Sequence, residues 1–431
     1  MSSEHAPSYY AASAHEAPAH PALDGEVTCD ACVIGAGITG SSAALELAER
    51  GYDTVVLEAR RVGWGASGRS GGQAIFGYAC DQSKLEKLVG RDDAHRLWEL
   101  SLEGMALLKD RLARYAIDCD YRPGHLHAAI KPRQLEELKA WQRELEDEYG
   151  YDSLRLLDRA EITGLMDTDR YLGGLYDAAS GHLHPLNYTL GLNAAATAAG
   201  ARLYEGSPAI AIEPAIAIQE GSTITVRTPN GTVRCRYLLL CGNAYLGDLA
   251  RPLRGKIMPV GTYIVATEPL GETLADSLIR NDMAVADINF VLDYFRRSAD
   301  TRLLFGGRVS YSTVAPPSLP QSMRARMLKV YPQLEYARIE YTWGGNVAIT
   351  MNRAPHFGRL AGNVFFAQGF SGHGIVMTGF AGKLLAEAVA GTAERLDVCA
   401  RIPHRPFPGG PLFRMPALVL AMAWYRLRDL L

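Results

Sequence analysis

The chain has 431 residues, more than one ordinary domain, and this length predicts two or three structural units. Its 44 basic and 47 acidic residues are interspersed and give a formal net charge of −3, so bulk charge attracts neither nucleic acid nor an acidic membrane. Seven cysteines scattered over the chain fit a reducing compartment better than a disulfide framework, and we expect a cytoplasmic protein.

The two ends of the chain differ in composition. Residues 1–25 are rich in Ala, Ser, His and Pro and lack the basic start and apolar centre of a signal peptide, so we expect an N-terminal arm. No window approaches the ~20 uninterrupted apolar residues of a transmembrane helix. Residues 416–425 are apolar but short and lie between Arg414 and Arg426. A packed C-terminal helix is the favoured interpretation there, and peripheral membrane contact is the alternative.

The stretch from 28 to 60 predicts a nucleotide site, because it has the order strand, glycine turn, helix, strand, acid. Gly35 permits the tight turn, Gly37 lets backbone amides approach a pyrophosphate, and Gly40 lets the helix lie close to the strand. The helix N-terminus then faces the phosphate charge. Glu58, at the end of the second strand, is placed to bind ribose hydroxyls. An acid there disfavours a ribose phosphate, which leaves FAD or NAD.

A glycine-rich loop follows at 60–73 and carries five glycines and one aromatic residue. Such a loop cannot form a stable helix and offers little core. A backbone with few side chains can run along a flat ring and give it amide hydrogen bonds, as a flavin requires. A flexible surface loop is the alternative interpretation.

The middle of the chain alternates helices and strands. We expect two helices over 84–115, a strand over 125–130, a charged amphipathic helix over 132–149, a strand over 171–176, a helix over 185–199 and strands over 201–240. His125 and His127 share one face of their strand but have no further ligand at metal spacing, so no metal site is predicted.

Long strands then predict a second, mostly antiparallel sheet, at 258–267, 288–296 and 302–308. A helix over 322–331 and a strand over 339–348, which carries Trp343, follow. The aromatic residues of this region could line a substrate pocket or fill a core; they are Tyr263, Phe290, Tyr294, Phe295, Phe305 and Tyr311.

Residues 363–374 again predict a strand and a glycine turn, followed by a helix over 375–390. Backbone amides and the positive end of that helix can stabilise negative charge on a reduced flavin. His373 lies in the turn and is a candidate polar group at this end of the cofactor, although a histidine in a turn also often serves as a hydrogen-bonded spacer.

Several blocks of the sequence resemble a known enzyme family. The loop GASGRSGGQ at 65–73 and the turn GFSGHG at 369–374 resemble the D-amino-acid oxidase, glycine oxidase and sarcosine oxidase group of FAD enzymes. The blocks at 8–14, 117–124, 241–248 and 407–410 are similar to its gamma-glutamylputrescine oxidoreductase and gamma-glutamyl-polyamine oxidase subfamily. The resemblance covers nearly the whole chain.

The resemblance implies a set of FAD contacts. It places the pyrophosphate on Gly35, Gly37 and Gly40, the ribose on Glu58 and adenine near Ala209. The flavin ring would lie along the loop, with the second turn at its pyrimidine end. The implied cofactor residues beyond the first motif are Ala59, Arg60, Ala66, Ser67, Gly71, Gly72, Gln73, Ala209, Gly242, Gly345, Gly372, His373 and Gly374.

The chain departs from sarcosine oxidase at two positions. Val376 stands where that enzyme has a lysine for the substrate carboxylate, which suits a larger amine with no carboxylate beside the reacting carbon. The strand 302–306 lacks the lysine that assists oxygen. No cysteine lies between Tyr336 and Phe357, where some relatives attach flavin, so we expect noncovalent FAD.

These observations predict an α/β fold, with a Rossmann-like FAD-binding domain interleaved with a smaller α+β substrate domain on a mostly antiparallel sheet. The expected division is an arm at 1–25, an FAD-binding domain at 26–118, 185–254 and 338–395, a substrate domain at 119–184 and 255–337, and a C-terminal tail and helix at 396–431.

The resemblance implies oxidation of an amine C–N bond, on a gamma-glutamylated putrescine or polyamine. A hydride passes to the flavin, the imine hydrolyses to an aldehyde, and oxygen accepts the electrons and yields hydrogen peroxide. Trp343 and Tyr294 are candidate pocket walls, and His373 a candidate polar group. A flavin dehydrogenase that serves a quinone or protein acceptor, and a noncatalytic or NAD-binding protein, are the alternatives.

Overall fold

A computed structural model describes residues 4–213, 223–289, 291–310 and 318–408, and it contains two sheets within these ranges. The eight-stranded sheet comprises β1 (Gly25–Ile34), β2 (Thr54–Leu57), β7 (Arg202–Tyr204), β8 (Ala211–Glu213), β9 (Ile224–Arg227), β10 (Gly231–Leu240), β16 (His356–Ala361) and β17 (Val364–Gln368). The nine-stranded sheet comprises β3 (Gln73–Ala74), β4 (Arg122–Ala129), β5 (Leu154–Asp158), β6 (Gly173–His182), β11 (Met258–Thr267), β12 (Ala284–Asp287), β13 (Tyr294–Arg297), β14 (Leu303–Ser310) and β15 (Ile339–Ile349).

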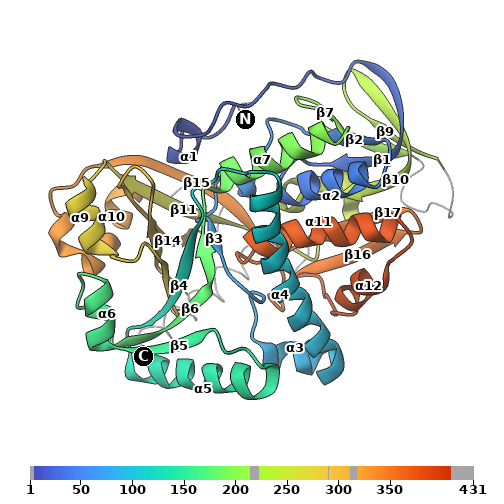
Figure 1. Cartoon of the computed structure of the whole chain (residues 1–431). Helices are drawn as coiled ribbons and strands as arrows, with labels where there is room; N and C mark the ends of the chain where they lie inside the picture. The colour runs from blue at the N-terminus through green and yellow to red at the C-terminus, as the bar shows by residue number, and fades with distance from the viewer. Residues whose placement is uncertain (1–3, 214–222, 290, 311–317, 409–431) are drawn as a thin grey trace.

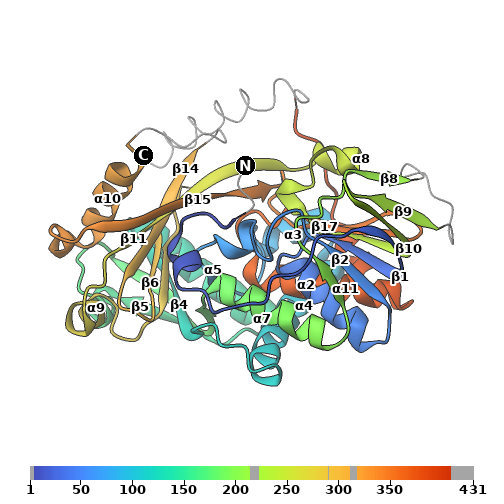
Figure 2. The ribbon, with the colours of Figure 1, turned by 90° about the horizontal axis from the view of Figure 1, so that it is seen from above.

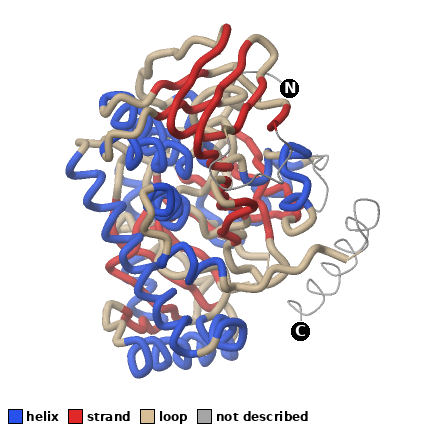
Figure 3. The backbone as a smooth tube through the Cα atoms, turned by 90° about the vertical axis from the view of Figure 1, so that its right-hand side faces the viewer, coloured by secondary structure: helices blue, strands red, loops and turns tan. Residues whose placement is uncertain are grey.

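Helices lie beside both sheets (Figures 1 and 3). They are α1 (Tyr9–Ala12), α2 (Ile38–Glu49), α3 (Gln82–Val89), α4 (Arg91–Arg114), α5 (Pro132–Tyr149), α6 (Arg159–Leu165), α7 (Pro185–Ala198), α8 (Arg251–Arg254), α9 (Glu272–Leu278), α10 (Leu319–Val330), α11 (Ile375–Val389) and α12 (Glu394–Ala400). The predicted fold class, a Rossmann-like unit with a second mixed unit, is confirmed by this arrangement.

The first sheet is built on a parallel core. β1 lies between β10 and β2, and Val33 pairs with Leu239 on one side and with Val56 on the other. All three side chains are buried, as expected for strands covered on both faces. Helices α2, α7 and α11 lie together against this sheet (Figure 1). The order strand, glycine turn, helix, strand therefore forms as the sequence predicts.

The second sheet is antiparallel except where β12 runs parallel to β4. The expected single strand over 288–296 is wrong, because the chain turns between β12 and β13. Asp287 causes this turn: its Oδ1 accepts from the amide of Asn289 at 3.0 Å, and its own amide donates to the carbonyl of Asp293 at 2.9 Å. Asp and Asn favour such local turns over strand pairing.

The chain passes between the sheets several times (Figures 1 and 2). β15 pairs with β11 along its whole length, so residues 339–349 lie in the second sheet. The sequence-based division instead grouped residues from 338 onward with the nucleotide-binding unit. β15 carries the chain from the second sheet back toward the first, and its C-terminal end therefore lies between them.

The N-terminal arm folds onto the body of the protein. Tyr10 in α1 is fully buried and its hydroxyl accepts a hydrogen bond from Arg296 Nη2 at 3.1 Å. The indole of Trp343 packs edge-on against Tyr10, with 5.2 Å between ring centroids. The arm is thus part of the core that supports the second sheet.

Some sequence-based expectations fall outside the described residues. These are the environments of Phe290 and Tyr311 and the apolar segment 416–425. Within the described part of the chain, no helix combines the length and apolarity that crossing a bilayer requires. No group of three or more His, Cys, Asp or Glu side chains there could hold a metal ion.

Candidate cofactor site and active site

The first glycine turn has no room for side chains where the sequence has glycine. A Cβ on Gly40 would lie 1.8 Å from the carbonyl oxygen of Gly35, and a Cβ on Gly37 would lie 2.7 Å from Ser67 Oγ. Gly35 has φ of +101°, a conformation that favours glycine. Helix α2 therefore begins directly on the turn, and the amides of its first turn other than that of Ile38 are available to an anion.

Glu58 and Ser67 close the sides of this turn. Glu58 Oε2 accepts from the amide of Ala36 at 2.8 Å and Oε1 accepts from that of Arg60 at 2.9 Å. Burial raises the pKa of Glu58, and these two amides act against that rise. Ser67 Oγ accepts from the amide of Ile38 at 3.0 Å, which ties the glycine-rich loop to the start of α2.

The glycine-rich loop is fixed rather than flexible. Arg296 Nε donates to the carbonyl of Gly71 at 3.0 Å, and the amide of Leu183 donates to the carbonyl of Gly72 at 2.8 Å. Gly72 has φ of +72°, and a Cβ there would lie 2.2 Å from the carbonyl oxygen of Leu183. The loop thus runs as a narrow ribbon of backbone between the two sheets.

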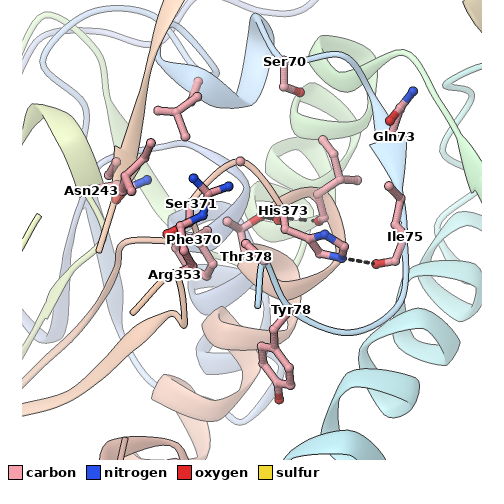
Figure 4. A pocket seen from close by; sticks show the side chains of 18 of the residues that line it. Ser70, Gln73, Ile75, Tyr78, Asn243, Arg353, Phe370, Ser371, His373 and Thr378 are labelled. Carbon is pink, nitrogen blue, oxygen red and sulfur yellow. Dashed lines mark hydrogen bonds between the residues drawn. The ribbon is translucent and has the colours of Figure 1, made fainter. Parts of the chain in front are cut away.

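A single cavity of about 1280 Å³ joins the first turn, the glycine-rich loop and the second turn. Every predicted cofactor residue except Gly40 and Gly345 lines it. Gly40 instead allows the close approach of α2, and a Cβ on Gly345 would face Arg69 at 3.4 Å. Residues separated by more than 300 positions in the sequence thus meet around one volume (Figure 4).

His373 in the second turn is neutral, and one of its ring nitrogens is left as an acceptor. Its Nε2 lies 3.2 Å from the carbonyl of Ile75 and 2.7 Å from that of Phe76, and because carbonyls only accept, Nε2 carries the hydrogen (Figure 4). Burial lowers its pKa, and the positive charge of Arg353 lowers it further. Nδ1 is then an acceptor, so His373 has no N–H left to donate to a ring in the cavity.

Tyr294 lines the cavity, whereas Trp343 does not. The Tyr294 ring lies over two glycines, since a Cβ on Gly71 would be 2.5 Å from its Cε2 and one on Gly306 would be 2.1 Å from its Cζ. The expectation that Trp343 is a pocket wall is corrected: the N-terminal arm covers its face of β15. Its Nε1 donates to the carbonyl of Arg69 at 3.0 Å and so supports the glycine-rich loop.

Three of the other predicted aromatic residues, and Val376, lie away from the cavity. Tyr263, Phe295 and Phe305 are buried in the core of the second unit and do not line the cavity. Val376 is also buried away from the cavity, because a Cβ on Gly104 of α4 would meet its Cγ1 at 3.1 Å. By contrast, Ile375 and Thr378, which lie before and after Val376 in the same helix, line the cavity.

Asn243 and Arg353 are among the polar residues of the cavity that sequence reasoning missed. Both have positive φ, +46° and +69°, which is uncommon for residues other than glycine and often marks functional sites. Asn243 Oδ1 accepts from the amide of Gly369 at 2.9 Å and so connects the end of β10 to the second turn. No sequence pattern signals a left-handed backbone at either residue.

A further wall of the cavity is aromatic and acidic. Its aromatic members are Phe76, Trp98 and Trp141. Asp81, Glu137 and Glu144 add carboxylates, and no ion pair joins any of these three to another described residue. Burial raises the pKa of Glu144, and the negative charges of Asp81 and Glu86 raise it further. This wall favours a cation over an anion.

The residues present fit an FAD molecule. The first turn offers backbone amides without a competing Cβ, and Glu58 lies beside it on the same cavity wall. The glycine-rich loop offers a side-chain-poor surface for a flat ring, and the second turn closes its far end.

The comparisons with known proteins agree with this geometry. Residues 30–388 match the DAO family, described as FAD dependent oxidoreductase. The chain is 45% identical over 427 residues to gamma-glutamylputrescine oxidoreductase of Escherichia coli K12, covering 99% of both chains. It is 40% identical to the probable oxidoreductase OrdL of Haemophilus influenzae, covering 99% of this chain and 98% of that protein.

Solved structures show the same fold at lower identity. Glycine oxidase from Bacillus cereus has a TM-score of 0.71 at 21% identity, covering 88% of this chain and 99% of that one. L-proline dehydrogenase from P. horikoshii has a TM-score of 0.71 at 22% identity, covering 88% and 98%. The chain belongs to the DAO family of FAD-dependent oxidoreductases, as the two glycine turns around one cavity indicate.

Proposed function

We propose that this enzyme holds FAD noncovalently and oxidises the terminal C–N bond of a gamma-glutamylated putrescine or a related polyamine, with oxygen as the electron acceptor. One observation carries the proposal: the cavity that joins both glycine turns continues to a wall with aromatic and unpaired acidic side chains. Such a wall suits an extended amine cation. The name of the Escherichia coli relative supports the gamma-glutamylputrescine assignment.

The proposed FAD contacts follow the cavity from end to end. Gly35, Gly37 and the first turn of α2 receive the pyrophosphate, Glu58 the ribose, and Ala209 the adenine. The loop from Ala66 to Gln73 supports the ring. Ala59, Arg60, Gly242, Gly372, His373 and Gly374 complete the lining.

Two cysteines at the cavity support noncovalent binding. Cys80 and Cys241 line it, and burial raises the pKa of each thiol to about 12. Both therefore stay protonated near neutral pH and are poor nucleophiles. The segment between Tyr336 and Phe357 contains no cysteine.

When bound, FAD would supply the electron sink for the hydride that leaves the carbon beside the amine nitrogen. The protein supplies position and protonation state. Glu137 and Glu144 attract the ammonium form to the mouth, and the aromatic wall then favours loss of its proton through desolvation. Tyr294 limits the volume beside the glycine-rich loop, while Trp343 holds that loop from behind.

A dehydrogenase that passes electrons to a quinone or a protein is the second candidate. The observation in its favour is the absence of a lysine from the strand segment 302–306. Arg302 there is no substitute, because its guanidinium donates to Asp300 and to Glu340 and it does not line the cavity.

A substrate panel tests the proposal. Protein reconstituted with FAD is mixed in air with gamma-glutamylputrescine, putrescine and spermidine, and aldehyde and hydrogen peroxide are measured together. The proposal expects equal amounts of both products and the highest kcat/KM with the gamma-glutamylated amine. Aldehyde formed only with an added quinone would support the dehydrogenase. No aldehyde from any amine would contradict both candidates.

A further inference from the structure

Arg353 lies beside the second glycine turn at the end of the cavity. It lines the cavity, and Figure 4 shows it among Phe370, Ser371 and His373. Hydrogen bonds fix this arrangement: the amide of Thr350 donates to Ser371 Oγ at 3.2 Å, and the amide of Ser371 donates to the carbonyl of Ala348 at 2.9 Å. The end of β15 and the turn therefore form one rigid wall.

The loop that carries Arg353 is also held in place. Thr350 Oγ1 donates to the carbonyl of Ala354 at 2.7 Å, and Asn352 Oδ1 accepts from the amide of Ala354 at 3.1 Å. These contacts keep Arg353 at φ of +69°, a conformation that costs free energy for a side chain with a Cβ. The fold thus maintains a strained residue to place this guanidinium.

The guanidinium has no counter-ion in the described part of the chain. No ion pair or side-chain hydrogen bond joins it to another described residue. Burial lowers its pKa, and the nearby Cys80 acts in the opposite direction. Placing a cation in a partly buried wall without a partner is costly, which is a strong reason to look for an anion in the cavity.

The neighbouring side chains carry no positive charge at this end. His373 is neutral, and its only N–H donates to the carbonyls of Ile75 and Phe76. Val376 is apolar and buried away from the cavity. Arg353 is therefore the cationic side chain next to the second turn, within the described residues that line the cavity there.

We propose that Arg353 faces the pyrimidine end of the flavin and stabilises the negative charge that develops there when the ring is reduced. This inference rests on the proposed placement of FAD, with the pyrimidine ring at the turn 369–374. A substrate carboxylate is the less favoured anion, because the same cavity also carries the carboxylates of Asp81, Glu137 and Glu144, which repel anions.

Sulfite provides a test that does not depend on turnover. It adds to N5 of oxidised flavin, and the adduct carries its negative charge at the pyrimidine end, so a nearby cation strengthens the adduct. We compare FAD-loaded wild type with R353M, R353K and the control R405M, whose exposed side chain does not line the cavity. The measurements are FAD content, the sulfite dissociation constant and the two-electron reduction potential.

The expected result is at least tenfold weaker sulfite binding for R353M. The two-electron reduction potential should fall by about 30 mV for each tenfold rise in the sulfite dissociation constant. R353K should recover most of the sulfite affinity, and R405M should match wild type. A wild type that binds FAD but no sulfite would overturn the inference. So would FAD-loaded R353M with wild-type sulfite affinity and a raised KM only for amines that carry a carboxylate. Failure of wild type to bind FAD would instead overturn the proposed cofactor placement.

Discussion

Replacement of Gly40 by alanine should separate helix α2 from the first glycine turn. The new Cβ would lie 1.8 Å from the backbone carbonyl oxygen of Gly35, and 3.2 Å from Cγ1 of Val33. A backbone atom cannot rotate away as a side chain can, so the helix must move by more than about 1 Å. Overpacking of this kind costs about 1–3 kcal/mol. Because the first amides of α2 are the proposed pyrophosphate site, we expect the FAD dissociation constant to rise about 5- to 150-fold.

Fluorescence titration of the apoprotein with FAD measures this change, with far-UV circular dichroism to show that each variant is folded. Gly37→Ala is a graded comparison, because its Cβ would meet only the side-chain oxygen of Ser67 at 2.7 Å, and that hydroxyl can turn aside. Its effect should be smaller. Gly164→Ala is the matched control, since no atom lies within 4 Å of a Cβ there. A folded Gly40→Ala protein with wild-type FAD affinity would refute the reasoning.

Three further predictions test the acidic wall, a buried histidine and the supporting tryptophan. Glu144→Gln should lower kcat/KM for a cationic amine severalfold and flatten the dependence of kcat/KM on ionic strength. Glu146 lies outside the cavity lining, so Glu146→Gln should change neither. Equal dependence on ionic strength in both variants would contradict a role of the acidic wall in attracting the amine. Burial, and then the charge of Arg296, lower the pKa of His184 to about 3 in the folded protein. Below pH 6.5 the unfolded state therefore binds one more proton at this residue than the folded state does, and the free energy of unfolding decreases as the pH falls. Near pH 5, His184 should contribute about 1.4 kcal/mol per pH unit to the slope of the unfolding free energy against pH. Denaturant unfolding of His184→Asn should show a slope smaller by this amount, and an unchanged slope would contradict the assignment. Trp343→Phe should lower the free energy of unfolding by about 1 kcal/mol, because the hydrogen bond to the carbonyl of Arg69 is lost. FAD affinity should fall somewhat and kcat should be nearly unchanged. A large loss of kcat in FAD-saturated protein would show that Trp343 acts in the pocket wall.

Local patterns predicted the first unit well because its signals are short-range. The apolar run, the three glycines and Glu58 occur within about thirty residues, and the structure forms β1, α2 and β2 there. The helix predicted over 132–149 has the bounds of α5, with Pro132 at its first position. Periodicity and capping determine such elements with little help from distant residues.

Long-range contacts explain what the sequence could not show. Trp343 was expected in the pocket, but the N-terminal arm covers its side chain, and the covering residue Tyr10 lies more than 300 positions away. The same holds for the arm, in which Tyr10 accepts a hydrogen bond from Arg296 and packs with residues of the second sheet. Arg353 and Asn243 enter the cavity through left-handed backbone conformations that arise from tertiary contacts. Propensity does not reveal such positions.

Anaerobic rapid mixing of the FAD-loaded protein with gamma-glutamylputrescine tests the central claim most directly. The visible absorption of the bound flavin is followed over time at rising amine concentration. We predict complete bleaching at a rate that saturates with amine and that exceeds the rate with unmodified putrescine. A flavin that stays oxidised with every amine tested, in protein that demonstrably holds FAD, would contradict the assignment as an amine oxidoreductase of this substrate class.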